Sequence, residues 1–518
     1  MDSTTPSSKK SYGQILKSSA LLGSSSAVIA VVGLLRNKAI ALILGPGGAG
    51  YWAACWAISE LARSIAGVGI NNSGVRQIAE SVATGDHQKI ARTVVTLRRV
   101  SIILGLMGAV GLSVLCVPVA QWYFKDREQA GLVALVALTV LFNTVSQGQI
   151  ALIQGMRRVG DYARNSLLGA VLGAGVSIPL IYGLHHMKWN PTVIVALALV
   201  CATFMALLSS WWFARKIKVE TVSLSRQEIT VEAKGLLKLG FVFMLSGVMM
   251  QGVMNLVTLI LLHRMDEQAV GLYSQAWLLS GYLAGFVFQA MGTDYYPRLT
   301  AVAHNHPECN RLVNEQAEVG MLLAGPALLA TQVLAPWLLH IAASGKFLPA
   351  TEVLRWFCLG MLLRAFSWPM SFVMMAKNAQ KSFFCTELFS NSLYIALVWF
   401  GVGRFGLNGV GMAFAMLYLI YTVLAYVIVR QLTGFRCSAE NLRIAAVYVG
   451  LAVSVFVAAK FLITPVAFGL GLVAVLGTGV FSVKRICTLM PPEHFPRTAR
   501  RVLVYFRLLP ASANAGTG

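Results

Sequence analysis

Long apolar blocks recur along almost the whole of this chain, and short polar segments separate them. A stretch of about 20 apolar residues is what an α-helix needs to cross the hydrocarbon core of a bilayer. The pattern therefore predicts an all-α polytopic membrane protein. It predicts fourteen membrane-spanning helices, which cover residues 15–44, 48–70, 93–117, 130–153, 165–184, 191–213, 235–262, 268–292, 313–341, 350–375, 382–402, 406–429, 444–463 and 465–483.

Composition excludes the common soluble classes. Of the 518 residues, 57% are hydrophobic and only 12% are charged, whereas a soluble chain carries about a quarter charged residues. Ordinary soluble enzymes and disordered chains are therefore excluded. The first dozen residues are polar and the first apolar block is too long for a cleavable signal peptide, so we expect that block to remain as a membrane helix.

The positive charge of the chain is unevenly distributed. With the N-terminus in the cytoplasm, 30 of the 42 Lys and Arg residues lie at cytoplasmic helix ends and loops, and seven lie on the opposite side. Cytoplasmic loops of membrane proteins carry such an excess, so both termini are predicted to be cytoplasmic. The charge is spread over short loops without a basic domain, which excludes nucleic acid as a partner. The basic tail, residues 484–518, is expected to lie on the anionic inner leaflet.

Signatures of enzymes and metal sites are missing from the sequence. It has no GxxxxGK[ST], HExxH or GxSxG motif, its eight cysteines form no CxxC, and its two His pairs stand without partners in predicted loops. We therefore expect no catalytic residues, no metal and no cofactor. A transporter is favoured over an enzyme.

A weak internal repeat divides the chain. Lys17 and Lys238, and likewise Gly50 and Gly271, are separated by 221 residues and stand at matching places of the predicted helices. An even number of spans in each half makes this a parallel repeat, in which the halves are related by an axis along the membrane normal with the substrate site between them. The pattern is typical of an alternating-access transporter. The predicted organisation is a cytoplasmic N-terminal tail (1–14), an N-terminal six-helix lobe (15–213), a cytoplasmic linker (214–234), a C-terminal six-helix lobe (235–430), two additional membrane helices or one re-entrant unit (431–483) and a basic cytoplasmic tail (484–518).

Ionisable residues inside the first two predicted helices need a reason, because each is costly in a membrane. Arg36 and Lys38 point about 200° apart around the first helix. Either one of them lines a central cavity while the other reaches the interface or pairs with a neighbour, or both side chains reach the outer interface. Glu60 and Arg63 lie three residues apart and can form an ion pair on one helix face. That pair either only neutralises itself, or Glu60 positions Arg63 for an anion or carries a proton.

Further charges lie in the later predicted helices. Arg355 and Arg364 face opposite sides of the tenth helix, and Arg364, which is deeper and precedes a Ser-Trp-Pro segment, is favoured for the cavity. Asp294 and Arg298 close the eighth helix and form either a cytoplasmic gate or a loop cap. Cations outnumber acids inside the predicted helices. This excess favours an anionic substrate, because arginine binds phosphate oxygens in bidentate fashion.

Short motifs distributed over about residues 13–430 occur in a particular order. They are Val32-Gly33-Leu34-Leu35-Arg36-Asn37-Lys38, Gly45-Pro46-Gly47-Gly48-Ala49-Gly50, Gly67-Val68-Gly69-Ile70 through Val75-Arg76-Gln77-Ile78-Ala79-Glu80, Tyr296-Pro297-Arg298-Leu299, and the run from Leu354-Arg355-Trp356 to Ala376-Lys377 that ends at Glu387. In order and spacing they resemble the bacterial polysaccharide flippases of the O-antigen translocase type. These belong to the multidrug/oligosaccharidyl-lipid/polysaccharide exporter superfamily.

The resemblance implies a V-shaped bundle of twelve to fourteen helices in two six-helix lobes. It also implies the flipping of undecaprenyl-diphosphate-linked sugars from the inner to the outer leaflet of the bacterial cytoplasmic membrane. The related lipid II flippases keep arginines in the first two helices, facing a cationic cavity, and Arg36 and Arg63 stand at the matching places. The chain departs from those relatives in carrying Asn37 where they have an acid, and in lacking an arginine in the eighth helix.

The resulting hypothesis is an alternating-access flippase for a lipid-linked oligosaccharide. The diphosphate would meet Arg36 and Arg63, with Arg364 and Lys38 as further cations, and Glu60 would carry the proton if transport is ion-coupled. Expected partners are the lipid-linked substrate, membrane lipids and other polysaccharide assembly proteins. Two alternatives remain: a multidrug antiporter of the same superfamily, and a membrane glycan ligase or polymerase. The sugars are expected to contact polar and aromatic residues of the seventh and eighth helices, namely Gln251, Asn255, Tyr273, Gln275 and Gln289.

Overall fold

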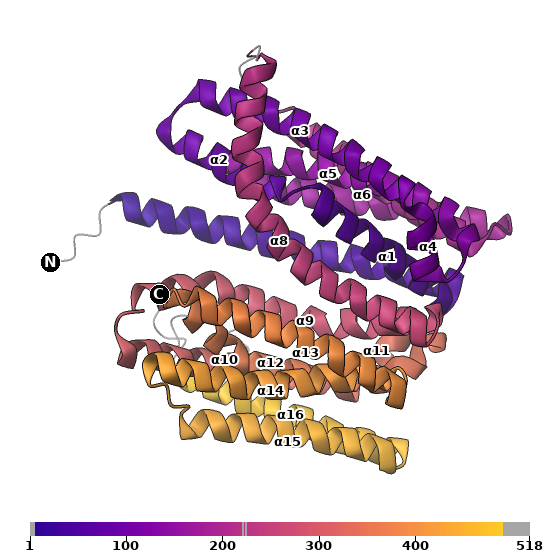
Figure 1. The fold of residues 1–518 in the computed structure, drawn as a ribbon. Coiled ribbons are helices and arrows are strands. Elements are labelled where there is room, and N and C mark those ends of the chain that lie inside the picture. Colours follow the sequence, from indigo (N-terminus) through magenta and orange to yellow (C-terminus); the bar gives the residue numbers. More distant parts are fainter. Residues whose placement is uncertain (1–5, 220–221, 223–224, 490–518) are drawn as a thin grey trace, which may run out of the picture. The chain divides into compact units, whose positions relative to one another are not determined.

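The protein is built from α-helices throughout the part of the chain that the structure describes. This structure is a computed structural model that describes residues 6–219, 222 and 225–489, with the backbone alone for residues 6–24. Within these ranges it contains α-helices, two short 3₁₀ segments and no β-strand (Figure 1). The α-helices are α1 (Pro6–Ala66), α2 (Ile70–Thr84), α3 (His87–Val114), α4 (Cys116–Phe124), α5 (Ala130–Gly155), α6 (Val159–His186), α7 (Pro191–Ala214), α8 (Arg226–Arg264), α9 (Glu267–Ala301), α10 (His306–Val333), α11 (Ala335–Ala342), α12 (Thr351–Ala376), α13 (Gln380–Phe405), α14 (Asn408–Thr433), α15 (Ala439–Phe461) and α16 (Thr464–Leu489), and the 3₁₀ segments are Arg127–Gln129 and Gly345–Ala350.

The helices are long and apolar enough to make this a multi-pass membrane protein. By length and composition, 11 helices of the described residues can cross a membrane, or 12 if α10 and α11, which are bent by 77° to each other, form one span. The predicted all-α polytopic class is confirmed, whereas the count of fourteen spans is not. Ser25–Ala66 counts as one long helix where the sequence predicts two, and α9 is not among the eleven.

Helix α1 is two helical segments joined by a sharp bend. Gly45 has φ 70° and ψ −168°, a backbone conformation outside the helical region that glycine adopts readily. The guanidinium of Arg36 lies 5.0 Å from the ring centre of Trp52, whereas a straight helix would separate two residues sixteen positions apart by about 24 Å. The chain therefore folds back at Gly45, between the predicted helices 15–44 and 48–70.

Local capping groups set where several helices begin. Asp86 accepts a hydrogen bond from the backbone N–H of Lys89 at the start of α3, and Asn190 accepts one from Thr192 at the start of α7. A capping box begins α8: the Glu228 N–H donates to Ser225 Oγ, and the Ser225 N–H donates to the Glu228 carboxylate. The hydrogen bond from the Ser225 backbone, followed by that from its side chain, lowers the pKa of Glu228.

The described helices group into two compact units. The first unit comprises Met1–Ser274 and Ala342–Lys346, and the second comprises Gln275–Ile341 and Phe347–Gly518. Helix α8, which the sequence assigns to the C-terminal lobe, packs in the first unit against α1, α2 and α3. The proposed boundaries of the six-helix lobes stay a prediction, and residues 490–518 of the predicted basic tail lie outside the described residues.

A reciprocal contact within the first unit supports the internal repeat. A Cβ at Gly50 would overlap the carbonyl oxygen of Glu267, and a Cβ at Gly271 would overlap the carbonyl oxygen of Pro46. Glu267 follows Pro46 by the same 221 residues that separate the two glycines. When two equivalent segments are related by a local two-fold axis, each contact between them occurs twice, with the two partners exchanged. Glycine at both positions allows the second segment of α1 and the start of α9 to touch backbone to backbone.

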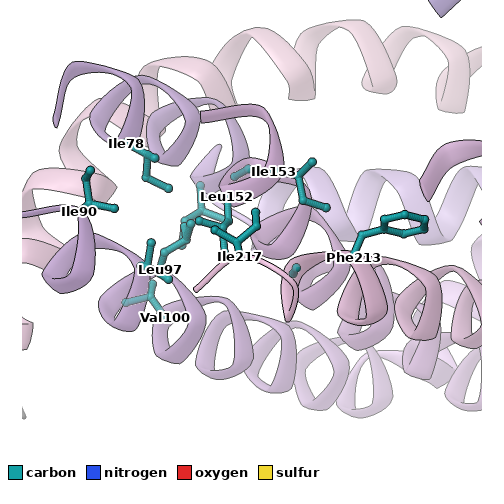
Figure 2. Close-up of a cluster of buried hydrophobic side chains, with 12 residues drawn as sticks. Ile78, Ile90, Leu97, Val100, Leu152, Ile153, Phe213 and Ile217 are labelled. Carbon is teal, nitrogen blue, oxygen red and sulfur yellow. The ribbon is translucent and has the colours of Figure 1, made fainter. Parts of the chain in front are cut away.

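The core of the first unit lies where α2, α3, α5 and the end of α7 converge (Figure 2). Leu97 of α3 and Leu152 of α5 are almost completely buried there, and Ile78 of α2 packs on them. The same cluster includes Phe213 and Ile217, so it also anchors the chain that leaves α7. Burial of large aliphatic side chains from four segments fixes these helix ends relative to one another.

Helices α15 and α16 are attached to the second unit by specific contacts. Gln332 of α10 donates a hydrogen bond of 3.0 Å to the carbonyl of Ala452 in α15. Arg485 of α16 forms an ion pair of 2.7 Å with Glu318 of α10. This ion pair fixes the last helix against α10.

Candidate functional site

A small polar cavity lies in the first unit beside the junction of α1 and α2. Its volume is about 310 Å³, and α5 and α8 complete its walls. One of its lining residues is a cation, Arg63, and no carboxylate is among them. The polar side chains that line it are Arg63, Ser64, Asn71, Asn72, Thr144 and Gln147.

Two close backbone approaches position this cavity. Val68 and Gly69 have positive φ, 43° and 60°, so the chain turns directly from α1 into α2. A Cβ at Gly69 would overlap the carbonyl oxygen of Gly240 in α8, and a Cβ at Gly240 would overlap that of Val68. Glycine at both positions brings α8 against the turn. The helix then continues to Phe243, Met244 and Gly247, which form one wall of the cavity.

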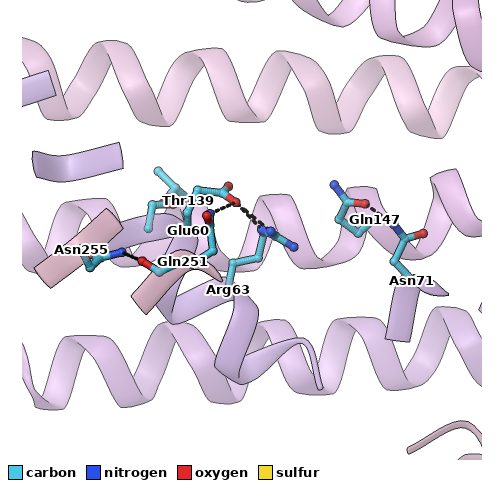
Figure 3. A network of polar contacts seen from close by, with 8 residues as sticks. Glu60, Arg63, Asn71, Thr139, Gln147, Gln251 and Asn255 are labelled. Carbon is cyan, nitrogen blue, oxygen red and sulfur yellow. Dashed lines mark hydrogen bonds and ion pairs between the residues drawn. The ribbon is translucent and has the colours of Figure 1, made fainter. Parts of the chain in front are cut away.

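Glu60 binds Arg63 (Figure 3), and Arg63 lines the cavity. The Nε and Nη2 atoms of Arg63 donate hydrogen bonds of 3.0 and 2.7 Å to Glu60 Oε2. The Arg63 side chain is 27% exposed and that of Glu60 is 14% exposed. Gln251 of α8 adds a longer hydrogen bond of 3.4 Å to the same carboxylate oxygen. The predicted spacing thus produces an ion pair, and the Arg63 guanidinium keeps further N–H groups for another anion.

Neutral polar residues extend this network on both sides. Asn71 donates a hydrogen bond of 2.8 Å to Gln147, and both line the cavity. On the other side Asn255 donates 2.9 Å to the Gln251 carbonyl, and Tyr123 donates 2.5 Å to Asn255. Sequence reasoning identified Gln251 and Asn255 but missed Asn71 and Gln147. The signal for those two was their amide groups within or next to apolar blocks, where polar side chains need partners.

Arg36 and Lys38 are not lining residues of this cavity. The Arg36 guanidinium stacks over the ring of Trp52, across the bend in α1, which is a favourable cation–π arrangement. Lys38 is half-buried. The structure therefore brings Arg63 and Glu60 together but leaves Arg36 and Lys38 at a different place in the first unit, and their roles stay predictions.

In the second unit Arg364 is held by aromatic rings. Its guanidinium lies 5.5 Å from the ring centre of Phe288 and 5.6 Å from that of Tyr418. Among the described residues it forms no ion pair. Arg355 instead donates 3.3 Å to the carbonyl of Gln332, which gives it a packing role within α10 and α12.

Gln275 is also in the second unit. It is 5% exposed, and its side-chain oxygen accepts no hydrogen bond from any residue that the structure describes. A buried amide oxygen in this state is costly unless a further donor reaches it. Gln275 therefore remains a candidate for a hydroxyl-rich ligand.

The predicted gate is only partly described. Arg298 is exposed near the end of α9. The side chain of Asp294 lies outside the described residues, as does that of Gln289. The role of Asp294 and Arg298 as a cytoplasmic gate or a loop cap stays a prediction. In the described ranges, no group of three His, Cys, Asp or Glu side chains is arranged to hold a metal ion.

Comparison with known proteins gives this arrangement a context. The chain is 20% identical over 410 residues to the lipid III flippase of Escherichia coli (strain K12), covering 79% of this chain and 96% of that protein. The lipid III flippase of Shigella flexneri matches to the same extent.

Solved structures show the same fold. The lipid II flippase MurJ in an inward closed conformation matches with a TM-score of 0.67 and 13% identity, over 90% of this chain and 99% of that one. An inward-facing multidrug resistance MATE family transporter of the MOP superfamily matches with a TM-score of 0.60 and 17% identity, over 78% and 94%.

The chain therefore shares its fold with the lipid II flippase and the MATE transporter. The family model described as "Polysaccharide biosynthesis protein" matches residues 39–352. The chain belongs to this family.

Proposed function

We propose that this protein flips an undecaprenyl-diphosphate-linked oligosaccharide, an O-antigen or similar surface polysaccharide unit, from the inner to the outer leaflet of the bacterial cytoplasmic membrane. Membership of the polysaccharide biosynthesis family and likeness to proteins named lipid II and lipid III flippases support a lipid-linked substrate. The positive-inside bias supports cytoplasmic termini. Transport proceeds by alternating access, and other polysaccharide assembly proteins receive the product.

The observation that carries this proposal is the arginine at the edge of a membrane-embedded polar cavity. Arg63 presents N–H groups beyond the two that Glu60 uses, and they suit the oxygens of a diphosphate. The amides of Asn71, Asn72 and Gln147 offer donors and acceptors for sugar hydroxyls next to it. An interior of low dielectric strengthens such polar contacts. A neutral or cationic ligand would gain much less from Arg63.

Glu60 is the proposed coupling group. While its carboxylate is ionised, it occupies two donors of Arg63. Proton binding would remove the negative charge and release those donors to the diphosphate, and proton loss would reclaim them. The ion pair would then exchange partners once in each transport cycle. This assigns the pair a role beyond neutralising itself.

The remaining predicted residues take supporting roles in the proposal. Arg36, Lys38 and Arg364 add positive charge along the transport path, and Gln275 offers an amide oxygen to sugar hydroxyls. Asp294 and Arg298 act as the cytoplasmic gate. The polyprenyl chain stays in the lipid throughout, because transferring it into a polar cavity would forfeit its hydrophobic stabilisation.

The test is the distribution of lipid-linked oligosaccharide between the two leaflets in a deletion strain. We expect accumulation on the cytoplasmic face, relieved by the wild-type gene and not by Arg63→Ala. Arg311→Ala is the matched control, because Arg311 also pairs with an acid three residues away, Glu308, but on an exposed helix face. The control should restore export fully.

Other outcomes would contradict the proposal. Full export by both Arg63→Ala and Arg36→Ala would exclude the cationic diphosphate site. An unchanged pool in the deletion strain, together with greater sensitivity to cationic drugs, would instead identify a multidrug antiporter. The likeness in fold to a MATE transporter makes that the second candidate.

A further inference from the structure

A second cavity of the first unit lies between residues 98–102 of α3, residues 145–149 of α5 and the end of α7, and it shares no lining residue with the cavity beside Arg63. Its volume is about 670 Å³. Three cations line it: Arg98 of α3, and Arg215 and Lys218 of the segment that follows α7. Its lining residues include no acid. Three positive charges around one cavity repel one another, so an anion that entered would be stabilised.

Asp161 is linked to the segment after α7 through Arg158, but the charge of this acid is already paired. Arg158 donates a hydrogen bond of 3.4 Å to the carbonyl of Lys216, within the segment that lines the cavity. Asp161 binds Arg158 at 2.6 Å and Arg164 at 3.9 Å. It therefore does not neutralise the cations of the cavity. In the part of the chain that the structure describes, Arg98, Arg215 and Lys218 form no ion pair.

Aromatic contacts hold one of these cations in place without neutralising it. The Arg215 guanidinium lies 4.8 Å from the ring centre of Trp211 and 3.8 Å from that of Trp212. Both tryptophans are about half exposed, at 50% and 45%, at the end of a helix that is apolar enough to cross the membrane. Tryptophan in this place is typical of the level of the lipid headgroups.

Core packing, a close helix approach and a hydrogen bond fix the residues that line the cavity. Ile217 is buried in the core cluster of Figure 2, so it fixes the positions of Arg215 and Lys218 on either side of it in the chain. A Cβ at Gly148 would overlap Ser101 Oγ, so glycine is needed where α5 approaches α3. Ser210 donates 2.6 Å to the oxygen of Gln149, which leaves the Gln149 amide nitrogen as a donor at the cavity.

We propose that this cavity binds the phosphate headgroup of an anionic phospholipid. The cations suit a phosphate, the tryptophans lie at headgroup depth, and the exposed Ile102 and Trp211 offer apolar surface to the acyl chains. Basic pockets between membrane helices on the cytoplasmic side bind such headgroups, and the charge distribution of the sequence places this end of the helices there. The site is separate from the proposed transport cavity and does not depend on the proposed function.

The test is native mass spectrometry of the purified full-length protein, titrated in detergent with phosphatidylglycerol or with phosphatidylethanolamine. The wild-type protein should prefer phosphatidylglycerol. Arg98→Gln/Arg215→Gln should weaken its binding at least about tenfold, because two of the three cations that line the cavity are then lost. The control Arg99→Gln/Arg164→Gln removes the same charge from arginines that do not line the cavity, and it should change binding less than about twofold.

Three results would overturn the proposal. Equal losses in the two double variants would mean that diffuse surface charge holds the lipid. Displacement of phosphatidylglycerol by millimolar inorganic phosphate would mean a site for free phosphate, and preferential displacement by a polyprenyl diphosphate would mean a site for the transported lipid. An unchanged unfolding temperature of both variants ensures that any loss of binding is local. If Arg98→Gln/Arg215→Gln is unstable, Lys218→Gln alone, with Arg99→Gln as its control, gives the same comparison with a smaller expected loss.

Discussion

Two arginines inside the membrane helices, Arg63 in the first unit and Arg364 in the second, are held in opposite ways. Arg63 is bound by a carboxylate: two of its nitrogens donate to Glu60 at 3.0 and 2.7 Å. Arg364 lies between two aromatic rings, at 5.5 and 5.6 Å from their centres. Glu387 is close enough to interact electrostatically with Arg364, but the two form no ion pair within the described residues.

The difference determines which arginine can be switched. A carboxylate cancels the charge of its partner until it takes up a proton or loses the partner to another anion. Aromatic rings fix a guanidinium through their quadrupoles and leave its full charge in place. In the proposed transport cycle Arg63 is therefore suited to a step in which its partner changes, and Arg364 to a constant attraction for anions.

The largest expected effect is the loss of Arg63. Arg63→Ala leaves the Glu60 carboxylate, which is 14% exposed, without its guanidinium, and we expect the free energy of unfolding to fall by about 2 kcal/mol. Glu60→Gln/Arg63→Ala should recover about 1 kcal/mol, because no charge is then left unpaired. Denaturation of the purified protein by SDS in mixed micelles measures both.

A matched pair elsewhere on the chain serves as the reference for that prediction. Arg311 and Glu308 have the same three-residue spacing but an exposed arginine, at 61%. Arg311→Ala should leave the free energy of unfolding almost unchanged, since exposed ion pairs contribute little. The prediction is contradicted if Arg63→Ala and Arg311→Ala lower the free energy of unfolding equally. It is also contradicted if Glu60→Gln/Arg63→Ala is no more stable than Arg63→Ala, because the ion pair would then not stabilise Glu60.

The sequence was sufficient for the features that depend on local spacing. The apolar blocks predicted the helical membrane fold, and the three-residue spacing of Glu60 and Arg63 placed both side chains on one helix face. The repeat of 221 residues identified Gly50 and Gly271 as equivalent. It did not show that Gly50 lies against Glu267 and Gly271 against Pro46. Such features follow from helix geometry alone.

Contacts across the fold could not be obtained in this way. The Asn71–Gln147 hydrogen bond joins residues 76 positions apart, and Arg36 meets Trp52 only because the chain folds back at Gly45. The lobe boundaries and the exact number of spans also depend on how long helices bend and pack. Residue type identified candidate polar groups, but which of them share a cavity is a property of the tertiary structure.

The second effect, of intermediate size, concerns Arg364. Arg364→Ala removes a cation without leaving an ion-paired carboxylate behind, so we expect a loss of about 1 kcal/mol, half of that for Arg63→Ala. The same SDS denaturation measures it. Export should fall as well, because a constant positive charge is lost from the proposed path. A loss of stability equal to that of Arg63→Ala would indicate that Arg364 is held by a carboxylate after all.

The smallest effect distinguishes the aromatic ring from the hydroxyl of Tyr418. Tyr418→Phe keeps the ring face 5.6 Å from the Arg364 guanidinium and should leave stability and export within error. Tyr418→Leu removes that face and should lower the free energy of unfolding by about 0.5–1 kcal/mol more than Tyr418→Phe does. In an Arg364→Ala background the difference between the two Tyr418 variants should shrink, because no cation is left to interact with the ring. A difference that persists undiminished in that background would come from packing alone, and the contrast between a carboxylate-held and a ring-held arginine would then no longer explain the two sites.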